Sequence, residues 1–272
     1  MDEAAAVVVS FSSVTLKGKG DLEDQVFEFE EAKSIDLMKL QGTMSQPLLE
    51  AVTIPAGTYN GITLGVNAEL DSQLDSYIML SEGGASYELY VPSGSESGLK
   101  LNKSFTVAAD SDALTVGDDA VYTIDFDLRK SIVQPPGQLN PDQEQAYFLK
   151  PVLRLVQNMQ TGTIRGEVDA ELLVADNCSD ADPDTGNAVY VYQGADIVPD
   201  DIDGEAAEPL TTALVKNDTS YEYEVGYLEA GPYTLAFTCR ADEEVDTEDN
   251  DLQFSAPVNV EVSEGEVSVV DF

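Results

Sequence analysis

Apolar side chains recur at every second position along many short stretches of this chain, and this alternation limits the fold more than any other feature. It is clearest in VVVSFSSVTL (7–16), VFEFE (26–30), SYELYV (86–91) and VYTIDFDLR (121–129). Side chains alternate between the two faces of an extended strand, so a period of two indicates strands with one buried face. Turn signals such as PAGTYNG and PPGQLNPDQ separate these stretches. The sequence therefore predicts an all-β protein.

Helix signals are sparse. SIDLMKLQGTM (34–44) predicts a turn or two of helix with Ser34 as its cap and Gly42 as its stop, and PDQEQA (141–146) predicts another. The composition changes near QNMQTGTIRG, and beyond it the strand-like runs are GEVDAELLV, AVYVYQG, SYEYEVGYL, GPYTLAFTC, PVNVEV and EVSVVDF. This spacing is typical of a small sandwich. We expect two β-sandwich domains in tandem, spanning 1–158 and 159–272, with few or no helices.

Two segments far apart in the chain, TIPAGTYNGITLGV (53–66) and YLEAGPYTLAF (227–237), share one local order. Each has an apolar residue, Ala-Gly, one further residue, a tyrosine and then an alternating strand. The glycine permits a left-handed turn, and the tyrosine begins a strand with its ring packed inward. We interpret the echo as a turn device of β-sandwiches, not as a duplication.

The chain carries 13 basic and 52 acidic residues, which give a formal net charge of -39. Such a field repels phosphate backbones and anionic lipid headgroups, so nucleic acid is not expected as a partner. The imbalance is greatest in residues 166–272, which hold 2 basic and 28 acidic side chains. Because mutual repulsion destabilises a compact state unless salt screens it, we expect a marine or halophilic habitat.

The chain contains no histidine. Serine triads, cysteine–histidine dyads and histidine-ligated metal sites are therefore excluded. Asp125 and Asp127 share a strand face in TIDFDLRK, and a glycosidase needs two carboxyl groups about 5 to 10 Å apart. The favoured alternative is cross-strand pairing of these acids with Lys100, Lys130 or Lys150. We expect no catalytic residues and no enzymatic activity.

Two cysteines, Cys178 and Cys239, are present. In GPYTLAFTC, Cys239 shares the apolar face of a strand with Tyr233, Leu235 and Phe237, so it should point into a core. A disulfide would close a loop of about 60 residues and stabilise the fold by about 4 kcal/mol. Two buried thiols in a reducing cytosol are the alternative.

No stretch has the ~18 uninterrupted apolar residues of a membrane span. The start MDEAAAV is not an export leader. Either the protein is cytosolic or its signal lies outside this sequence, and the cysteines favour export.

The segment CSDADPDTGN (178–187) places three aspartates at alternate positions. An EF-hand is excluded, because glycine is missing from its sixth position and glutamate from its twelfth. A looser cage remains, since a disulfide would bring this loop towards the acidic run RADEEVDTEDND (240–251). The interpretations are an acidic surface or a calcium site. The ligands of a calcium site would be Asp180, Asp182, Asp184, Asp242 and Glu243.

Residues 2 to 156 resemble domain of unknown function family 4382, through the segments AVVVSFSSVTL, SIDLMKLQG, TIPAGTYNGITLGV, YVPSGSESGLKL, YTIDFDLRKSIV and YFLKPVLRLV. The resemblance implies an exported β-rich domain of bacterial surface or periplasmic lipoproteins, often tethered by a lipidated cysteine upstream. It implies no activity. Members usually begin with a further strand, whereas this chain opens at DEAAAV. An absent strand would leave a sheet edge open for pairing with another chain.

Residues 159–272 resemble a carboxypeptidase regulatory-like or transthyretin-like sandwich, through GTIRGEV, LEAGPYTLAF and VNVEVSEGEVSVVDF. The resemblance implies a non-catalytic spacer or adhesive unit. We therefore expect an exported lipoprotein module of the bacterial periplasm, outer membrane or cell surface that binds a glycan or protein, or acts as a scaffold. One alternative is a homo-oligomeric subunit of a surface assembly or filament that pairs through an open sheet edge. The other is a carboxylate-based glycosidase.

Overall fold

In the computed structural model, the described residues are 4–50, 52–80, 84–91, 98–108, 121–134, 146–150, 152–174, 178, 186–204, 207–216, 220–244, 249–250 and 252–272. They form an all-β protein, as predicted, with two short α-helices among them. The chain divides into two compact units. The N-terminal unit contains Ala4–Leu40 and Ser45–Asn158, and the C-terminal unit contains Gln41–Met44 and Met159–Phe272.

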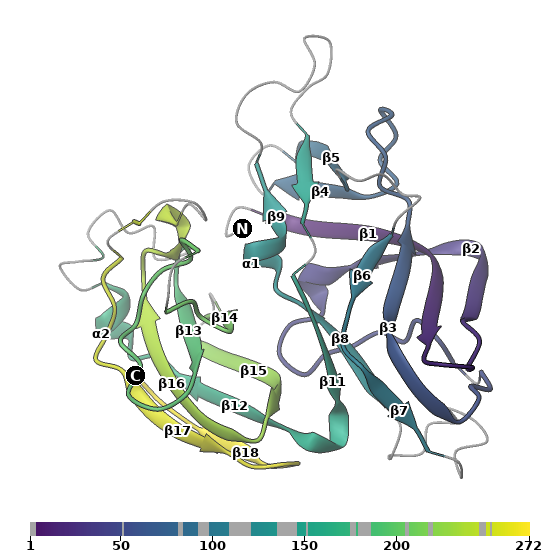
Figure 1. Cartoon of the computed structure of the whole chain (residues 1–272). Coiled ribbons are helices and arrows are strands. Elements are labelled where there is room, and N and C mark those ends of the chain that lie inside the picture. The colour runs from purple at the N-terminus through teal and green to yellow at the C-terminus, as the bar shows by residue number, and fades with distance from the viewer. Residues whose placement is uncertain are drawn as a thin grey trace. The chain divides into compact units, whose positions relative to one another are not determined.

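Most of the N-terminal unit is one large sheet (Figure 1). Its strands run in the order β6-β3-β1-β4-β5-β10-β9, with β2 also paired to β1 and β7 to β3. A separate two-stranded sheet joins β8 to β11. The strands are β1 (Ala4–Gly18), β2 (Gln25–Asp36), β3 (Gly57–Val66), β4 (Tyr77–Leu80), β5 (Ser86–Tyr90), β6 (Leu99–Leu101), β7 (Phe105–Val107), β8 (Tyr122–Phe126), β9 (Ile132–Val133), β10 (Tyr147–Leu149) and β11 (Leu153–Gln157).

The first strand, β1, lies inside this sheet. It pairs with β2 on one edge and with β4 and then β3 on the other. The consecutive residues Val7, Val8 and Val9 are all buried, as suits a strand covered on both faces. Consequently β1 offers no free edge between Val8 and Leu16.

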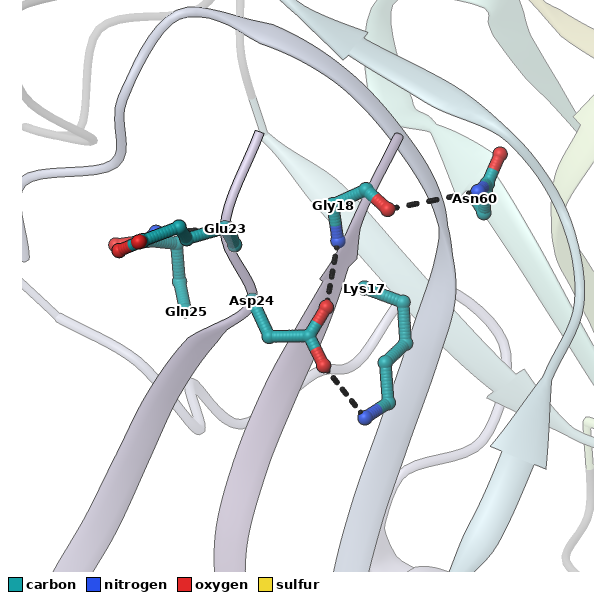
Figure 2. Close-up of polar contacts among 6 residues, drawn as sticks. All are labelled: Lys17, Gly18, Glu23, Asp24, Gln25 and Asn60. Atoms are coloured by element: carbon teal, nitrogen blue, oxygen red, sulfur yellow. Dashed lines mark hydrogen bonds and ion pairs between the residues drawn. The ribbon is translucent and has the colours of Figure 1, made fainter. Parts of the chain in front are cut away.

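A polar network closes the turn between β1 and β2 (Figure 2). The Lys17 ammonium lies 2.8 Å from Asp24 Oδ2, and the Gly18 N–H donates to Asp24 Oδ1 at 3.0 Å. These two hydrogen bonds lower the pKa of Asp24, and the one from Lys17 has the larger effect. A Cβ on Gly18 would lie 2.0 Å from the Leu22 carbonyl oxygen, so the turn requires glycine. The network is a structural feature of the hairpin.

The C-terminal unit is a sandwich of two sheets (Figure 1). One has the order β15-β12-β18 and the other β14-β13-β16-β17. Their facing side chains form one core, which includes Ile164, Val191, Tyr223, Leu235 and Phe237. The strands are β12 (Thr161–Glu167), β13 (Ala188–Gln193), β14 (Thr211–Leu214), β15 (Glu222–Glu229), β16 (Gly231–Thr238), β17 (Val258–Val262) and β18 (Val267–Val269).

Strand β13 is buried on both of its faces. Val189 and Val191 point into the core between the sheets. Tyr190 and Tyr192 point the other way, into a second apolar cluster with Ile202 and partly buried Leu252 and Phe254. The segments after β13 and after β16 therefore cover the outer face of the four-stranded sheet.

The repeated Ala-Gly-x-Tyr segments form the same structure in both units. The buried Tyr59 hydroxyl donates to the Pro55 carbonyl at 2.8 Å, and the buried Tyr233 hydroxyl donates to the Glu229 carbonyl at the same distance. Each tyrosine thus ties the start of its strand to the residue four positions earlier. Gly57 and Gly231 have positive φ angles of 152° and 146°. The two segments thus share one local turn structure, which is what the interpretation as a turn device predicts.

Two local expectations were wrong. The DAELLV part of the predicted strand is helical, because Asp169 caps α2 (Ala170–Leu173) by accepting the Glu171 N–H at 2.9 Å. The helix expected at 34–44 is reduced to η1 (Leu37–Lys39), capped by Asp36, since Ser34 pairs with β1 as part of β2. Most of the helix predicted at 141–146 lies outside the described residues.

Candidate functional site

The two cysteines form a disulfide, as predicted. Their Cα atoms are 5.7 Å apart and they are separated by 61 positions in sequence. Cys178 and Cys239 are both buried and belong to the core between the sheets. The expected inward orientation of Cys239 is therefore confirmed. The bond ties the segment before β13 to the residue that follows β16.

The calcium ligands predicted from sequence are only partly described. Asp180, Asp182 and Asp184 lie outside the described residues. Asp242 and Glu243 lie in η6 (Ala241–Glu243), where Glu243 accepts from Arg240 Nε at 2.9 Å. The far end of the aspartate loop does reach this helix, because the Ala241 N–H donates to the Gly186 carbonyl at 3.0 Å. Across the part of the chain that the structure describes, no three acidic or cysteine side chains are grouped to hold a metal ion.

The two carboxylates considered for glycosidase chemistry have separate structural contacts. Asp125 on β8 lies directly opposite Arg154 on β11 and accepts from its Nε at 3.0 Å and its Nη2 at 2.5 Å. A cross-strand cation was expected, but the partner is Arg154 instead of a lysine. Asp127 lies beyond the end of β8 and caps α1 (Leu128–Ser131), with its Oδ1 accepting the Lys130 N–H at 3.2 Å.

Asp127 is a buried acid, with 7% of its surface exposed. Its Oδ2 has no hydrogen-bond partner among the described residues. Burial raises the pKa of Asp127, and the Asp125 charge adds to this, against the opposing effects of the Lys130 charge and N–H and of Arg129. The carboxyl group therefore faces a mixed environment in which cations offset part of the desolvation.

A further group of acids lies on the segment after β13, in the run DDIDG (200–204), and on the segment after η6. The second segment belongs to the run 240–251 singled out from the sequence above, whereas the first was not singled out. The Tyr192 hydroxyl donates to the Asp200 carbonyl at 2.5 Å and accepts the Asp200 N–H at 3.0 Å. Glu244 accepts the Ile202 N–H at 2.7 Å and the Tyr190 hydroxyl at 2.5 Å. Tyrosines of β13 thus anchor both acidic segments.

Asp201 is the buried acid of DDIDG, with 2% of its surface exposed. Its Oδ2 accepts the Asn250 N–H at 2.5 Å, whereas its Oδ1 is buried without a hydrogen-bond partner among the described residues. Burial is the main cause that raises the pKa of the neighbouring Asp200, and the charges of Asp201, Asp203 and Asp249 raise it further. The sequence signals for this group were the close spacing of acids in DDIDG and the acidic run 240–251.

The helices that the structure describes are short, and none has the length and hydropathy of a bilayer-crossing segment.

Three solved structures show distant similarity to this chain. The minor pilin GBS52 of Streptococcus agalactiae is 10% identical over 98% of this chain and 81% of its own, with a TM-score of 0.22. The TIE protein of Bacillus anthracis is 10% identical over 99% of this chain but 34% of its own, with a TM-score of 0.23. A pilus-presented adhesin, Cpa, is 9% identical over 97% of this chain and 95% of its own, with a TM-score of 0.16. Scores this low support no argument about function.

No curated protein matches the chain. For residues 159–272, the carboxypeptidase regulatory-like resemblance stays a prediction. For the N-terminal residues, the family comparison gives a match. Residues 1–151, more than half of the chain, match the domain of unknown function DUF4382, and the chain belongs to that family.

Proposed function

We propose that this protein is a non-catalytic module of the bacterial envelope or cell surface that binds a glycan or protein ligand or acts as a scaffold. The observation that carries the proposal is the state of Asp125 and Asp127. Asp125 is paired with Arg154, and Asp127 is buried as the cap of α1. Hydrolysis by paired carboxylates needs one acid and one base that both face the same substrate bond. This pair does not have that arrangement.

The disulfide supports the exported location in this proposal. Disulfides persist in the periplasm and at cell surfaces, whereas cytosolic thiols are kept reduced. Cys178 and Cys239 are also both buried in the core, which is typical of a structural bond and not of a redox-active one. The lipid anchor upstream, implied by the family resemblance, is part of the same proposal.

A paired measurement of binding and turnover tests this function. We expect the intact protein to bind at least one class of ligand on a glycan array or in a panel of purified envelope components. It should release no product from chromogenic glycosides. Turnover that is lost in both D125N and D127N would overturn the proposal. Failure to bind any member of the two panels would count against the ligand-binding form and leave only scaffolding, which the next experiment addresses.

A second candidate function, subunit of a surface assembly, is favoured by β18. Within the described residues, β18 pairs only with β12. Val267 and Val269 on this edge strand are 52% and 61% exposed. An apolar edge strand is a site for pairing with another chain, and natural proteins commonly protect such edges with lysine.

Light scattering over a concentration series distinguishes this second candidate. We expect oligomers that grow with concentration and that the V267K/V269K variant lacks. The matched control is E261K on β17, which adds a lysine at an exposed position on the edge strand of the other sheet. A monomer at every concentration, or equal assembly by wild type and V267K/V269K, would contradict assembly through β18.

A further inference from the structure

We propose that β18 (yellow in Figure 1) pairs with β18 of a second copy of this chain, antiparallel and about a two-fold axis. The three-stranded sheets of the two copies would thereby join into one continuous sheet. This inference rests on the second candidate function above, assembly through β18. It goes further by naming the partner, the register of the pairing and a limit of two chains.

β18 differs from the other edge strands of the C-terminal unit in its residues and their exposure. β15 and β17 carry glutamates, among them Glu222 and Glu261. β14 is uncharged, but two of its residues are buried and two are half-buried. β18 has the sequence VSV, and both Val267 and Val269 are exposed. Since charge and cover are common means of protecting an edge, β18 is the least protected edge among these strands.

The backbone groups that β18 directs outward belong to the same two valines. The Val270 N–H donates to the Arg165 carbonyl at 3.0 Å, and the Glu266 carbonyl accepts from β12 at the same distance. Alternate residues of a strand direct their backbone groups to opposite sides. The even-numbered residues therefore bond to β12, and Val267 and Val269 direct their N–H and C=O groups away from it. On that side, no strand of the described residues pairs with β18.

The side chains of Val267 and Val269 share the outer face of their sheet. Val270 belongs to the core between the sheets, and the Ser268 hydroxyl donates to the Glu261 carbonyl of β17 at 3.0 Å. Because side chains alternate along a strand, the two valines point away from that core. A two-fold axis perpendicular to the sheet brings the outer faces of two copies to the same side. The valines of both copies would then lie together on one surface.

The two valines favour one register of this pairing. If Ser268 lies opposite Ser268 of the second copy, each Val267 lies opposite a Val269, which gives two valine pairs across the axis. A shift by two residues leaves a single valine pair. A shift by one residue turns the valines of the two copies to opposite faces.

The same register keeps acidic side chains apart. Three acids flank β18, namely Glu264, Glu266 and Asp271. Continued in this register, the pairing places them opposite Phe272, Val270 and Gly265 of the second copy, respectively. No acid then lies opposite an acid, and like charges directly opposite one another are destabilising. The edge is therefore complementary to itself, as an interface between two identical chains requires.

The pairing is weak and depends on salt, because the strand is short and two copies repel each other. β18 has 3 residues, and each chain has a formal net charge of -39. The screening length falls from about 10 Å at 0.1 M salt to about 3 Å at 1 M. The dimer should therefore become more populated as salt is added. A contact held by ion pairs would instead weaken.

Sedimentation equilibrium of the full chain, over a concentration series at about 0.1 M and about 1 M salt, tests the stoichiometry and the salt dependence. We expect the mass to rise to two chains and no further, with tighter association at the higher salt. V267T/V269T keeps the β-branched shape but removes the apolar pairs, and it should raise the Kd of the dimer roughly tenfold. The matched control is V26T, at a valine on β2 that is 58% exposed, and it should leave the Kd unchanged.

Oxidative cross-linking of single-cysteine variants tests the register. S268C should form a disulfide-linked dimer, because residue 268 lies on the axis and meets its own copy at a Cα separation of about 4.5 Å. V267C alone should cross-link far less, since its nearest copy lies diagonally at about 7 to 8 Å. A mixture of V267C and V269C should cross-link between the two variants. This mixture carries the test if S268C does not fold.

The outcomes separate this inference from the functions proposed above. Growth beyond two chains that V267K/V269K abolishes would support assembly through β18 but overturn the two-fold pairing. A monomer at every concentration would contradict both. A dimer that cross-links neither through S268C nor in the mixture would overturn the register, and a dimer that dissociates as salt is added would overturn the apolar contact. None of these results bears on the non-catalytic envelope role.

Discussion

Asp127 in the N-terminal unit and Asp201 in the C-terminal unit are buried aspartates with the same hydrogen bonding. One oxygen of each accepts a backbone N–H, from Lys130 and Asn250 respectively. The other oxygen of each has no hydrogen-bond partner among the described residues. Their neighbours in the chain differ. The charges of Lys130, Asp125 and Arg129 act on Asp127, whereas Asp201 stands in the run DDIDG, which contains no basic residue.

The difference shows how a chain of strongly negative charge handles buried acids. The N-terminal half holds most of the basic residues, so a local cation can offset the desolvation of Asp127. The C-terminal half has two, Lys216 and Arg240, and these form salt bridges with Glu222 and Glu243. The same buried group thus caps a helix in one unit and binds the backbone of a distant segment, through the Asn250 N–H, in the other.

The largest expected effect comes from removing the disulfide, which lies in the C-terminal unit. The variant C178A/C239A should lose about 2 to 5 kcal/mol of stability in the C-terminal unit, because the bond no longer limits its unfolded chain. Urea unfolding followed by tyrosine fluorescence and circular dichroism measures this loss. The transition of the N-terminal unit should not move. Equal shifts of both transitions would show that the units do not unfold separately.

The next effect concerns the cap formed by Asp127. D127A should destabilise the N-terminal unit by about 1 to 2 kcal/mol, since the Lys130 N–H loses its acceptor and the nearby cations lose their counter-charge. D127N keeps an acceptor and should lose less. Chemical denaturation of the two variants is the measurement. If D127A is as stable as D127N, the capping role is wrong.

A smaller effect tests what the two units have in common. Y59F and Y233F each remove one hydroxyl bond to the carbonyl four residues earlier, and each should cost about 1 kcal/mol. Similar losses, measured by thermal unfolding, would confirm that the tyrosine hydrogen bond contributes equally to the stability of both units. A loss in only one of them would mean that the surrounding packing, and not the bond, is decisive.

The smallest effect is the pH dependence contributed by Asp127. Its folded-state pKa is raised by burial, so the folded state takes up a proton before the unfolded state does as the pH falls. Stability should therefore rise as the pH falls through this pKa towards the ordinary carboxyl range. Comparing wild type with D127N between about pH 7 and about pH 5 isolates the contribution. A gain of the same size in D127N would assign it to other acids.

The strands were predictable because alternation is a local property. Val7, Val9 and Phe11 follow the period of two, and so do Tyr233, Leu235 and Phe237. Strand β14 was missed because its inward residues, Thr211 and Ala213, carry little hydrophobic signal. The helix α2 was missed because one capping residue, Asp169, outweighs the apolar pattern that follows it.

The candidate sites were less predictable, because register and burial depend on residues far away in sequence. Asp125 meets Arg154 across 29 positions, and the lysines nearer in sequence were the natural expectation. In the sequence, Asp201 belongs to the run DDIDG, which looks like an ordinary acidic surface loop. It is buried because Tyr190, Tyr192 and Ile202 form an apolar cluster on the outer face of β13.

By itself the sequence determined the strand-rich fold, the family and the pair of cysteines available for a disulfide. It also excluded catalytic and metal sites that need histidine, because the chain has none. These follow from composition and from neighbours within a few residues. Only the tertiary structure decided which acids are exposed, which are paired and which are buried without a partner. The reason is physical: the charge that a carboxylate can keep depends on its solvation and on the groups around it, and both are set by contacts between distant segments.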